Sequence, residues 1–467
     1  MRTRVIFWPI YAVLPFLAGC ASLAPDGSFS DVAAMVEQRI GRQIYWGGRG
    51  DGADVAAATA DLLWRPLTPS RAVHIALLNN KTLRAEYTKL GIAQADLVQA
   101  ALPPNPIAAG TITFADSGAT NLVFGGALQV IELLRIPLKK RVAKSQLEQA
   151  KIGVASSVLR VVAATQIAFI KYQAAQHLVE HLNATLEAAR AAVTAAEGLR
   201  KAGNITALEF ETQNAELIGA ELNSTRAKTR ASQAREALNV LMGLGPAQTG
   251  WRAQNKLPDV PQREISTKAA EPRAINANLE LAGARQNLFT LAQKHNLTRA
   301  QAIAPEGAAG GEWEQDSGEE EAGPIFEVTL PIFDWGQARK ARARMEIARA
   351  RDAYAALIVK VGATARSATK DLQSARKTAL YHRSTALPQA GRLMRESQRQ
   401  YNAMQLDIFR LIRAKQNQIL AEQKQIDALA NYWVARASFL QLMKGTLPVE
   451  SAAFASPTAN GSETDDN

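Results

Sequence analysis

The sequence predicts a mainly α-helical fold with a small β part, built from one unit that occurs twice in tandem. Three observations predict it. Landmark residues of the first half recur 201 positions later, two stretches of roughly 60 residues carry heptad-spaced small and apolar side chains, and short segments of alternating polarity precede each stretch. Each half of the chain is therefore expected to contain both strands and a long helical hairpin.

The composition narrows the class of protein. Apolar residues make up 47 % of the 467 residues and charged residues 21 %, which excludes a disordered chain. No run of about 18 uninterrupted apolar residues occurs in the body of the chain, so no membrane-spanning helix is expected there. The net charge is +11, but Lys and Arg are interspersed with Glu, Asp and Gln, as on solvated helix faces. Nucleic acid is therefore not expected as a partner.

The N-terminus has the layout of an export signal. Arg2 and Arg4 precede the apolar stretch Val5–Leu17, and small residues follow it. The segment ends in LAGC, which resembles the bacterial lipobox and identifies Cys20 as the residue to be acylated, with palmitate among its acyl chains. Cys20 is also the only cysteine, so no internal disulfide is possible. The alternative is an incidental thiol.

The predicted signal peptide covers residues 1–19. No Asp follows Cys20, which in proteins that resemble enterobacterial lipoproteins favours the outer membrane. We therefore expect a protein that is exported, anchored by lipid to the cell outer membrane, and largely periplasmic.

The repeat is visible in several landmarks. The stretch AREALNVLMG (234–243) corresponds to ARASFLQLMK (435–444), and SRAVHIAL (70–77) corresponds to PRAINANL (272–279). The landmarks keep the same order in both halves, which indicates a tandem duplication. The predicted organisation is an extended N-terminal segment at 20–67, repeats at 68–246 and 268–446, a Pro-bearing linker at 247–267 and a disordered tail at 447–467.

Within the first repeat, residues 139–200 predict one long helix. Its heptad row is Leu147, Val154, Val161, Ala168, Ala175, Leu182 and Ala189. A helix of that length measures about 90 Å, far more than a usual globular element. The second repeat has the same pattern from about Gln337 to Asn402. Each long helix is expected to reverse, at RKAGNIT and QYNAMQLD, into a second helix that ends at an LM landmark.

Segments of period two precede each long helix. NLVFGGALQV (121–130), GTITF (110–114) and IFEVTL (325–330) place apolar side chains on one face and small or polar side chains on the other. The third strand, within residues 301–315, alternates poorly. This alternation suits a barrel wall between lipid and water, and the alternative is a soluble two-layer sheet.

Several motifs together resemble the TolC-type outer-membrane efflux channels. They are the lipobox, the duplicated unit, NNKTLRAE (79–86), QAALPPNP (99–106) and PIFDWGQARKAR (331–342). YNAMQLDIFRL (401–411) resembles the periplasmic turn of members associated with heavy-metal export. The first half lacks the FDxG junction and has only RIPLKKR in its place.

The resemblance implies a passive, non-enzymatic duct without a cofactor. Four strands cannot close a barrel in lipid, because open edges leave backbone groups unpaired. Three copies supply twelve strands, so the implied assembly is a homotrimer whose β-barrel is continued by an α-helical periplasmic tube. The implied partners are outer-membrane lipid, a periplasmic adaptor (membrane fusion protein) and an inner-membrane pump of the RND type.

The resemblance also places two kinds of site at the helical turns. The adaptor is expected to dock on the two turns, and a closed gate is expected to be held by polar contacts at the second turn. Thr206 and Asp407 are also good helix N-caps, which would explain both without a further role. The docking candidates are Gly203, Asn204, Thr206, Ala403, Met404 and Asp407, and the gate candidates are Asp407, Arg410 and Arg413.

Two other functions compete with a channel. An enzyme would need convergent polar groups, and no GxSxG, P-loop or HExxH motif occurs. His177 and His181 lie four residues apart, and His382 is the repeat equivalent of His181, but no third ligand is evident and no metal site is predicted. The second alternative is a lipid-anchored periplasmic coiled-coil scaffold or adaptor without a channel.

Overall fold

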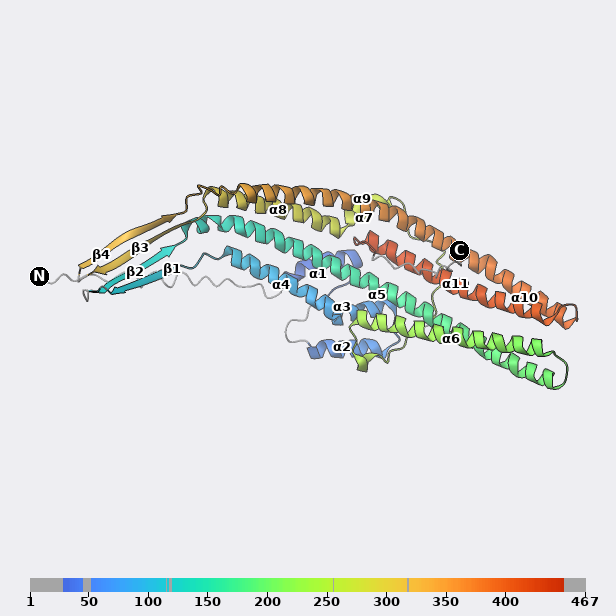
Figure 1. Cartoon of the computed structure of the whole chain (residues 1–467). Helices are drawn as coiled ribbons and strands as arrows, with labels where there is room; N and C mark the ends of the chain where they lie inside the picture. The colour runs from blue at the N-terminus through green and yellow to red at the C-terminus, as the bar shows by residue number, and fades with distance from the viewer. Residues whose placement is uncertain are drawn as a thin grey trace, which may run out of the picture. The chain divides into compact units, whose positions relative to one another are not determined.

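The computed structural model describes residues 28–44, 52–114, 116, 120–254, 256–316 and 319–448. Cys20, the predicted signal peptide and all but the first two residues of the predicted tail therefore lie outside the described residues. The described chain is mainly helical with one small sheet, as predicted (Figure 1).

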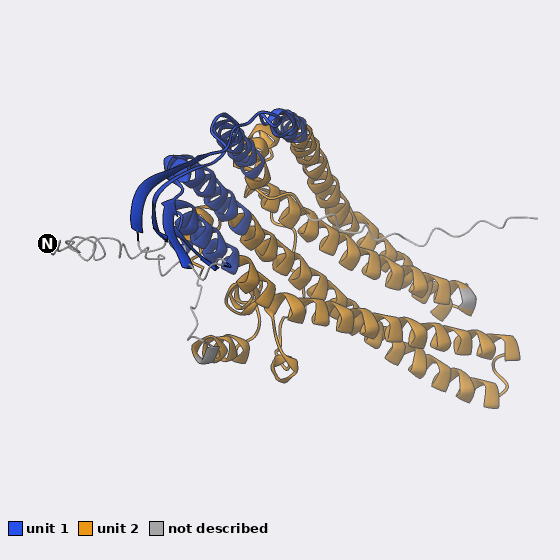
Figure 2. Ribbon diagram, turned by 60° about the vertical axis from the view of Figure 1, so that its left-hand side comes forward, with its two compact units in different colours: residues 1–32, 87–154, 282–355 blue, residues 33–86, 155–281, 356–467 orange. Residues whose placement is uncertain are grey.

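The chain forms two compact units, shown in Figure 2. Unit 1 contains residues 1–32, 87–154 and 282–355, and unit 2 contains residues 33–86, 155–281 and 356–467. Each unit draws on both sequence repeats, so the repeats are not separate compact domains. The order helix, helix, strand, strand, long helix, helix nevertheless occurs twice along the chain.

The sheet lies in unit 1 and has four antiparallel strands in the order β1-β2-β3-β4. The strands are β1 (Ile107–Phe114), β2 (Thr120–Leu128), β3 (Gly307–Asp316) and β4 (Glu319–Val328). Strand β2 of the first repeat pairs with β3 of the second, so β1 and β4 are the edges. All four predicted strands are confirmed, including the third.

The weak alternation of β3 has a structural reason. Its first half is rich in glycine, and a Cβ at Gly310 would overlap the carbonyl oxygen of Gly126 on β2. The two backbones therefore approach too closely for a side chain at this point. Because glycine has no side chain, the alternation of polar and apolar side chains along β3 is interrupted here.

The helices of the first repeat are α3 (Pro69–Asn79), α4 (Lys81–Ala101), α5 (Val130–Lys201) and α6 (Ala207–Met242). Those of the second are α7 (Ala270–Ala277), α8 (Leu279–Ile303), α9 (Gln337–Tyr381), α10 (Leu387–Asn402) and α11 (Ile408–Met443). A π-helical segment, η4 (His382–Ala386), joins α9 to α10, and a 3-10 turn, η3 (Pro246–Gln248), begins the linker.

The expected boundary of the first long helix is wrong at its start. The predicted strand 121–130 ends at Leu128, and α5 begins at Val130 rather than at residue 139, so Pro137 lies inside the helix. A proline two turns from a helix start removes only one backbone hydrogen bond, and 72 residues of regular helix can bear that loss.

The second long helix carries an irregularity that the sequence analysis did not identify. Pro388 lies at the start of α10 and has no N–H to donate. Just before it, the Leu387 N–H bonds to the His382 carbonyl, five residues back, in the π-helical η4. The helix therefore continues past the proline through a widened turn.

The predicted extended segment at 20–67 is wrong where it is described. Residues Phe29–Ile40 form helix α1 and Gly52–Trp64 form helix α2. In α1, Val32 and Val36 are fully buried, one turn apart. Two short amphipathic helices gain their stability from such burial rather than from their own length, which a periodicity search over long windows does not detect.

The recurring landmarks lie in the core of unit 2. Leu238 and Met242 at the end of α6 are fully buried with Phe169 and Tyr172 of α5, and Trp251 of the linker covers them. At the end of α11, Phe439 is the counterpart of Leu238 and is 1 % exposed, Leu442 is the counterpart of Leu241 and is 0 % exposed, and Met443 is half-buried. The two LM stretches are therefore alike because each ends a helix in the same kind of packed seam.

Helix α5 is apolar enough over one 18-residue window to cross a membrane by length and composition, and 61 % of that window is buried inside the protein. Burial of this kind is typical of a packed core helix. The polar residues that interrupt its heptad pattern are satisfied: Lys151 pairs with Asp31 and Glu148, and the Thr165 hydroxyl donates to the Val161 carbonyl.

Candidate functional site

The sheet of unit 1 has two chemically different faces. Strand register places eight large apolar side chains on one face: Ile112, Phe114, Leu122, Phe124, Leu128, Trp313, Phe326 and Val328. Five of them are between 52 % and 77 % exposed, and Trp313 stacks on Phe124 at a centroid distance of 6.2 Å. A continuous exposed apolar face on a thin sheet indicates contact with lipid or with another apolar surface.

The opposite face is acidic. Six carboxylates lie on it: Glu312, Glu314, Asp316, Glu319, Glu321 and Glu327. The four strands contain no Lys or Arg, although the whole chain carries a net charge of +11. This face is therefore a locally negative surface on a basic protein.

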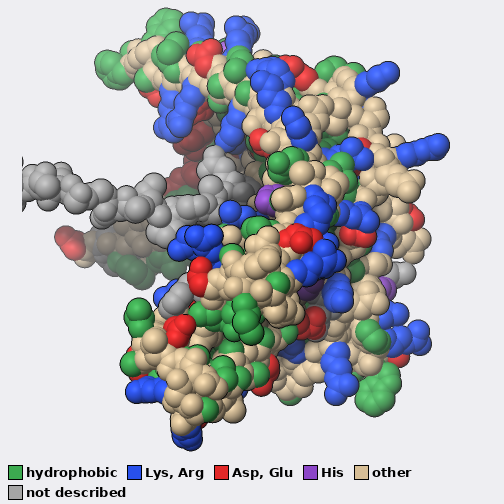
Figure 3. Space-filling view, turned by 90° about the vertical axis from the view of Figure 1, so that its right-hand side faces the viewer, with side chains coloured by type: hydrophobic (Ala, Val, Ile, Leu, Met, Phe, Trp, Pro, Cys, Tyr) green, Lys and Arg blue, Asp and Glu red, His purple; other side chains and the backbone are tan. Residues whose placement is uncertain are grey.

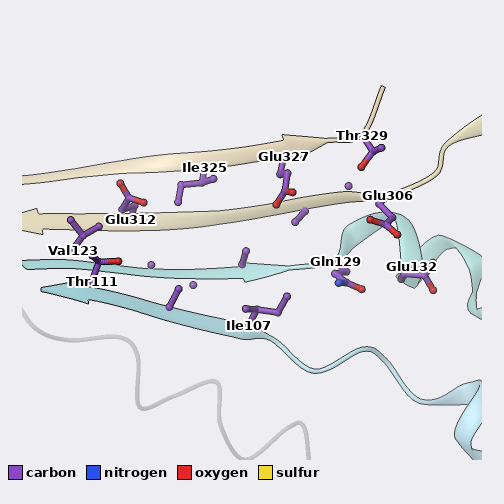
Figure 4. Close-up of a pocket in the computed structure, with 16 residues that line it drawn as sticks. Ile107, Thr111, Val123, Gln129, Glu132, Glu306, Glu312, Ile325, Glu327 and Thr329 are labelled. Atoms are coloured by element: carbon purple, nitrogen blue, oxygen red, sulfur yellow. The ribbon is translucent and has the colours of Figure 1, made fainter. Parts of the chain in front are cut away.

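A cavity of about 310 Å³ lies along this acidic face. Figure 4 shows its lining, with Glu312 and Glu327 on the strands and Glu306 and Glu132 where strands meet helices. Glu132 forms ion pairs with Arg135 and Lys139 on its own helix. Among the described ion pairs, Glu312 and Glu327 on the strands have no such cationic partner.

Two of the motifs that carry the resemblance have structural roles. The side chain of Asn79 donates to the Met242 and Gly243 carbonyls at the end of α6, at 3.3 and 2.7 Å. Asn80 donates to the Leu241 carbonyl at 2.7 Å and accepts the Leu83 N–H at 2.8 Å. The asparagine pair thus satisfies carbonyls that the helix end leaves unpaired.

The second motif, PIFDWGQARK, forms the junction between β4 and α9. Gly336 has φ +72°, a left-handed conformation that favours glycine. Asp334 stabilises this turn, because its side chain accepts the Gly336 N–H at 2.7 Å and pairs with Arg339 at 2.9 Å. Trp335 and Phe333 in the same turn are 65 % and 91 % exposed.

The two helical turns have the same backbone design in unit 2. Thr206 caps α6 and accepts the Glu209 N–H, and the Glu209 carboxylate accepts the Thr206 N–H in return, so the two residues form a capping box. Asp407 caps α11 and accepts the Arg410 N–H at 3.0 Å. The predicted N-caps are therefore confirmed.

The left-handed residue of the second turn is Met404. Gly203 has φ +74° and Met404, 201 positions later, has φ +57°, whereas Ala403 keeps an ordinary φ of −85°. Gly203 and Met404 are thus the equivalent left-handed positions of the two turns. The Met404 side chain is 96 % exposed. The constant offset of the repeat was the signal that could have identified it.

The gate candidates are not brought together into one network. Asp407 pairs with Arg410 at 3.3 Å on the same helical turn, and both side chains are more than half exposed. Arg413 is exposed and makes no ion pair within the described part of the chain. Before the turn, on α10, Arg399 pairs with Glu396 at 2.8 Å. Exposed pairs of this kind contribute about 0–1 kcal/mol each.

A groove of about 910 Å³ runs between the hairpin α5–α6 and the hairpin α10–α11. Alanines of α5 form one wall, and Leu411, Ile412 and Ile419 of α11 are on the other. The Gln416 amide donates to the Glu216 carboxylate across the two hairpins. Figure 3 shows Lys and Arg interspersed with Asp and Glu on one face of the molecule, without a single large basic patch.

One histidine links two helices of unit 2. Nδ1 of His181 lies 3.2 Å from a carboxylate oxygen of Glu422 on α11. Burial lowers the pKa of His177, and this effect outweighs that of the nearby Glu180, which raises it. Among the described residues, no three His, Cys, Asp or Glu side chains converge as metal ligands.

No protein-family model matches the sequence, and no curated protein does. Solved structures match closely in fold. A membrane protein from Pseudomonas aeruginosa has a TM-score of 0.71 at 20 % identity, covering 81 % of this chain and 90 % of its own. The CmeC outer membrane channel of Campylobacter jejuni has 0.71 at 16 % identity, covering 81 % and 86 %.

CusC, whose structures concern transmembrane channel formation, has a TM-score of 0.69 at 14 % identity, covering 82 % of this chain and 94 % of its own. At these identities the likeness establishes the fold. The chain therefore has the fold of outer-membrane channels, in agreement with its resemblance to TolC-type efflux channels. The similar structures with descriptive names are channels rather than enzymes.

Proposed function

We propose that this chain is one subunit of a trimeric outer-membrane efflux channel, a passive exit duct without catalytic activity. Cargo would reach it from an inner-membrane pump of the RND type through a periplasmic adaptor. The observation that carries the proposal is the sheet of unit 1, which combines two unpaired edges with one apolar and one acidic face.

An open four-stranded sheet is not stable in lipid. Strands β1 and β4 each present a row of unpaired backbone groups, and each missing hydrogen bond in hydrocarbon costs several kcal/mol. Pairing β4 of one copy with β1 of the next satisfies these groups. Three copies close twelve strands into a barrel with the apolar face towards lipid and the carboxylates towards the lumen.

The lipid anchor would hold the N-terminus at the same membrane. Acylation requires the thiol of Cys20, and the resemblance of LAGC to a lipobox supports it. We expect Cys20→Ser to abolish metabolic labelling with palmitate and to leave the signal segment uncleaved. Normal labelling of that variant would exclude acylation at this residue.

The helical turns at 203–206 and 403–407 would contact the adaptor. Both are exposed, and Met404 presents an apolar side chain to solvent at the tip of the second turn. Asp407, Arg410 and Arg413 would form the resting gate through contacts that become complete only when copies assemble, because the pair within one chain is local to α11.

The alternative, a periplasmic scaffold without a channel, is less well supported. A scaffold in water has no use for a sheet whose Phe114 and Phe326 are 77 % and 76 % exposed. A lipid-facing barrel wall requires such a surface.

The test is purification of the acylated protein in detergent, followed by mass measurement and single-channel recording in planar bilayers. We expect a trimer that conducts ions, at first weakly because the gate is closed. A monomer, or a trimer with no conductance even when Arg410 and Arg413 are both replaced by Ser, would contradict the proposal.

A further inference from the structure

One contact in unit 2 joins the two sequence repeats. His181 belongs to α5 of the first repeat and Glu422 to α11 of the second, and Nδ1 of the imidazole lies 3.2 Å from the carboxylate. Their side chains are 15 % and 34 % exposed. The pair is therefore one of the contacts through which the helices of the first repeat pack against those of the second.

The repeat supplies a second copy of the same pair of residues. Adding 201 to His181 gives His382, and subtracting 201 from Glu422 gives Glu221. Within one chain these two residues do not meet. The His382 side chain is half-buried and its Nδ1 has no hydrogen-bond partner among the described residues, whereas Glu221 is 50 % exposed and pairs with Arg190 at 3.5 Å.

Apolar side chains at equivalent positions of the two repeats also differ in their exposure. Ile419 of α11 and Ala192 of α5 line the groove between the hairpins. Their equivalents, Ile218 of α6 and Leu393 of α10, are 58 % and 45 % exposed. Leu222, one turn from Ile218, is 52 % exposed. Ile419 and Ala192, which are half-buried at the first junction, therefore have exposed equivalents at the second.

A single chain can make the junction from first to second repeat only once. In a closed ring of copies, each second repeat must meet another first repeat, and that one belongs to the neighbouring copy. Similar units joined in a ring tend to use similar contacts at each junction, because the same side chains are offered at each.

We propose that His382 of one copy pairs with Glu221 of the next copy, with Leu393 packed on Ile218 and Leu222 beside it. The surface formed by His382 and Leu393 is therefore one half of the interface between copies. Glu221, Ile218 and Leu222 form the other half. This inference rests on the proposed trimer and adds the residues that join its helical parts.

The test uses pairs of introduced cysteines and a short bifunctional maleimide. His382→Cys combined with Glu221→Cys is expected to give covalent dimers and trimers in denaturing gels. The matched positive control is His181→Cys with Glu422→Cys, which should link within one chain and leave the mass of a monomer. Single variants exclude reaction through Cys20.

The negative control moves one cysteine along the same face of α6. Ser232 is exposed and lies 11 residues, or about 16 Å, from Glu221. His382→Cys with Ser232→Cys should give no covalent trimer. Equal linking of the 221 and 232 variants, or none at 221 while the protein remains trimeric, would overturn the inference. Absence of a trimer in the parent protein would instead overturn the proposed function.

Charge exchange provides an independent readout. Glu221→Lys is expected to lower the temperature at which the trimer dissociates, because Lys replaces the partner of His382. Adding His382→Glu should restore the dissociation temperature of the parent. If the double variant is no more stable than Glu221→Lys alone, the two residues do not face each other.

Discussion

At the residue scale, Met404 adopts a left-handed backbone conformation in the second helical turn, which is unusual for a residue other than glycine. A side chain in the left-handed region costs roughly 1–2 kcal/mol, and Met404 regains little of this through packing because it is 96 % exposed. The first turn avoids the cost with Gly203. A strained, exposed methionine is therefore more easily explained by a contact outside the chain than by the needs of the turn.

We predict that Met404→Gly leaves the turn intact, with the free energy of unfolding changed by less than about 1 kcal/mol. Export should nevertheless fall at least severalfold, because the apolar contact with the adaptor is lost. Growth of cells in the presence of an exported toxic compound measures this. Met404→Leu serves as the control and should keep export, since it retains apolar surface. Normal export by Met404→Gly would remove Met404 from the docking surface.

Asp407 offers a second test at this scale, because its carboxylate has two roles. One oxygen accepts the Arg410 N–H as the N-cap of α11, and the other pairs with the Arg410 guanidinium. Asp407→Asn keeps the cap and removes the charge. We expect it to raise single-channel conductance without lowering stability, whereas Asp407→Ala should also cost about 1 kcal/mol of stability. Unchanged conductance in the Asn variant would assign the carboxylate to capping alone.

At the element scale, the linker between the repeats is tied to the helices by a few polar side chains. Glu264 accepts a hydrogen bond from the Tyr432 hydroxyl at 2.6 Å and one from Arg436 at 3.2 Å, and Arg376 lies 3.6 Å away. At the other end, Trp251 stacks edge-on against Tyr172. A segment without long secondary structure thus becomes part of the packed unit 2.

This linkage predicts a pH dependence. Burial alone would raise the pKa of Glu264, but hydrogen bonds from Tyr432, the Ile265 N–H and Arg436 outweigh it and leave the pKa below its ordinary 4.5. The charged carboxylate therefore stabilises the fold above that value, and this contribution is lost as the pH falls through the lower pKa of the folded state. Thermal unfolding of the parent and of Glu264→Gln should differ at pH 7 and converge towards pH 3. A constant difference would show that the charge of Glu264 is not involved.

At the scale of the whole molecule, the acidic face of the sheet would line a channel only when several copies of the chain assemble. In one chain, the carboxylates of β3 and β4 are exposed to solvent on an open sheet. In the proposed barrel, three copies of this face enclose one lumen without an intervening Lys or Arg from the strands. Enclosed charges of one sign attract counter-ions and repel co-ions more strongly than charges on an open surface.

We predict that the channel prefers cations, and that Glu312→Gln, Glu314→Gln and Glu321→Gln together reduce this preference severalfold. The reversal potential across a salt gradient measures it, and the effect should be largest at low ionic strength, where screening is weak. Glu320 lies on the apolar face of β4, so Glu320→Gln is the matched control and should leave the preference unchanged. A triple variant with the selectivity of the parent would place the selective charges elsewhere in the duct.

The sequence alone determined the elements and their duplication. The heptad rows of 139–200, the alternation of 121–130 and the caps Thr206 and Asp407 are local patterns that follow from helix and strand periodicity. Only the tertiary structure decided how those elements combine. In the tertiary structure, β2 of one repeat pairs with β3 of the other, and His181 lies against Glu422. The described part of the N-terminal segment forms two helices, and the left-handed residue of the second turn is Met404. These features depend on contacts between residues far apart in the chain or on backbone angles, neither of which is recorded in the polarity of neighbouring side chains.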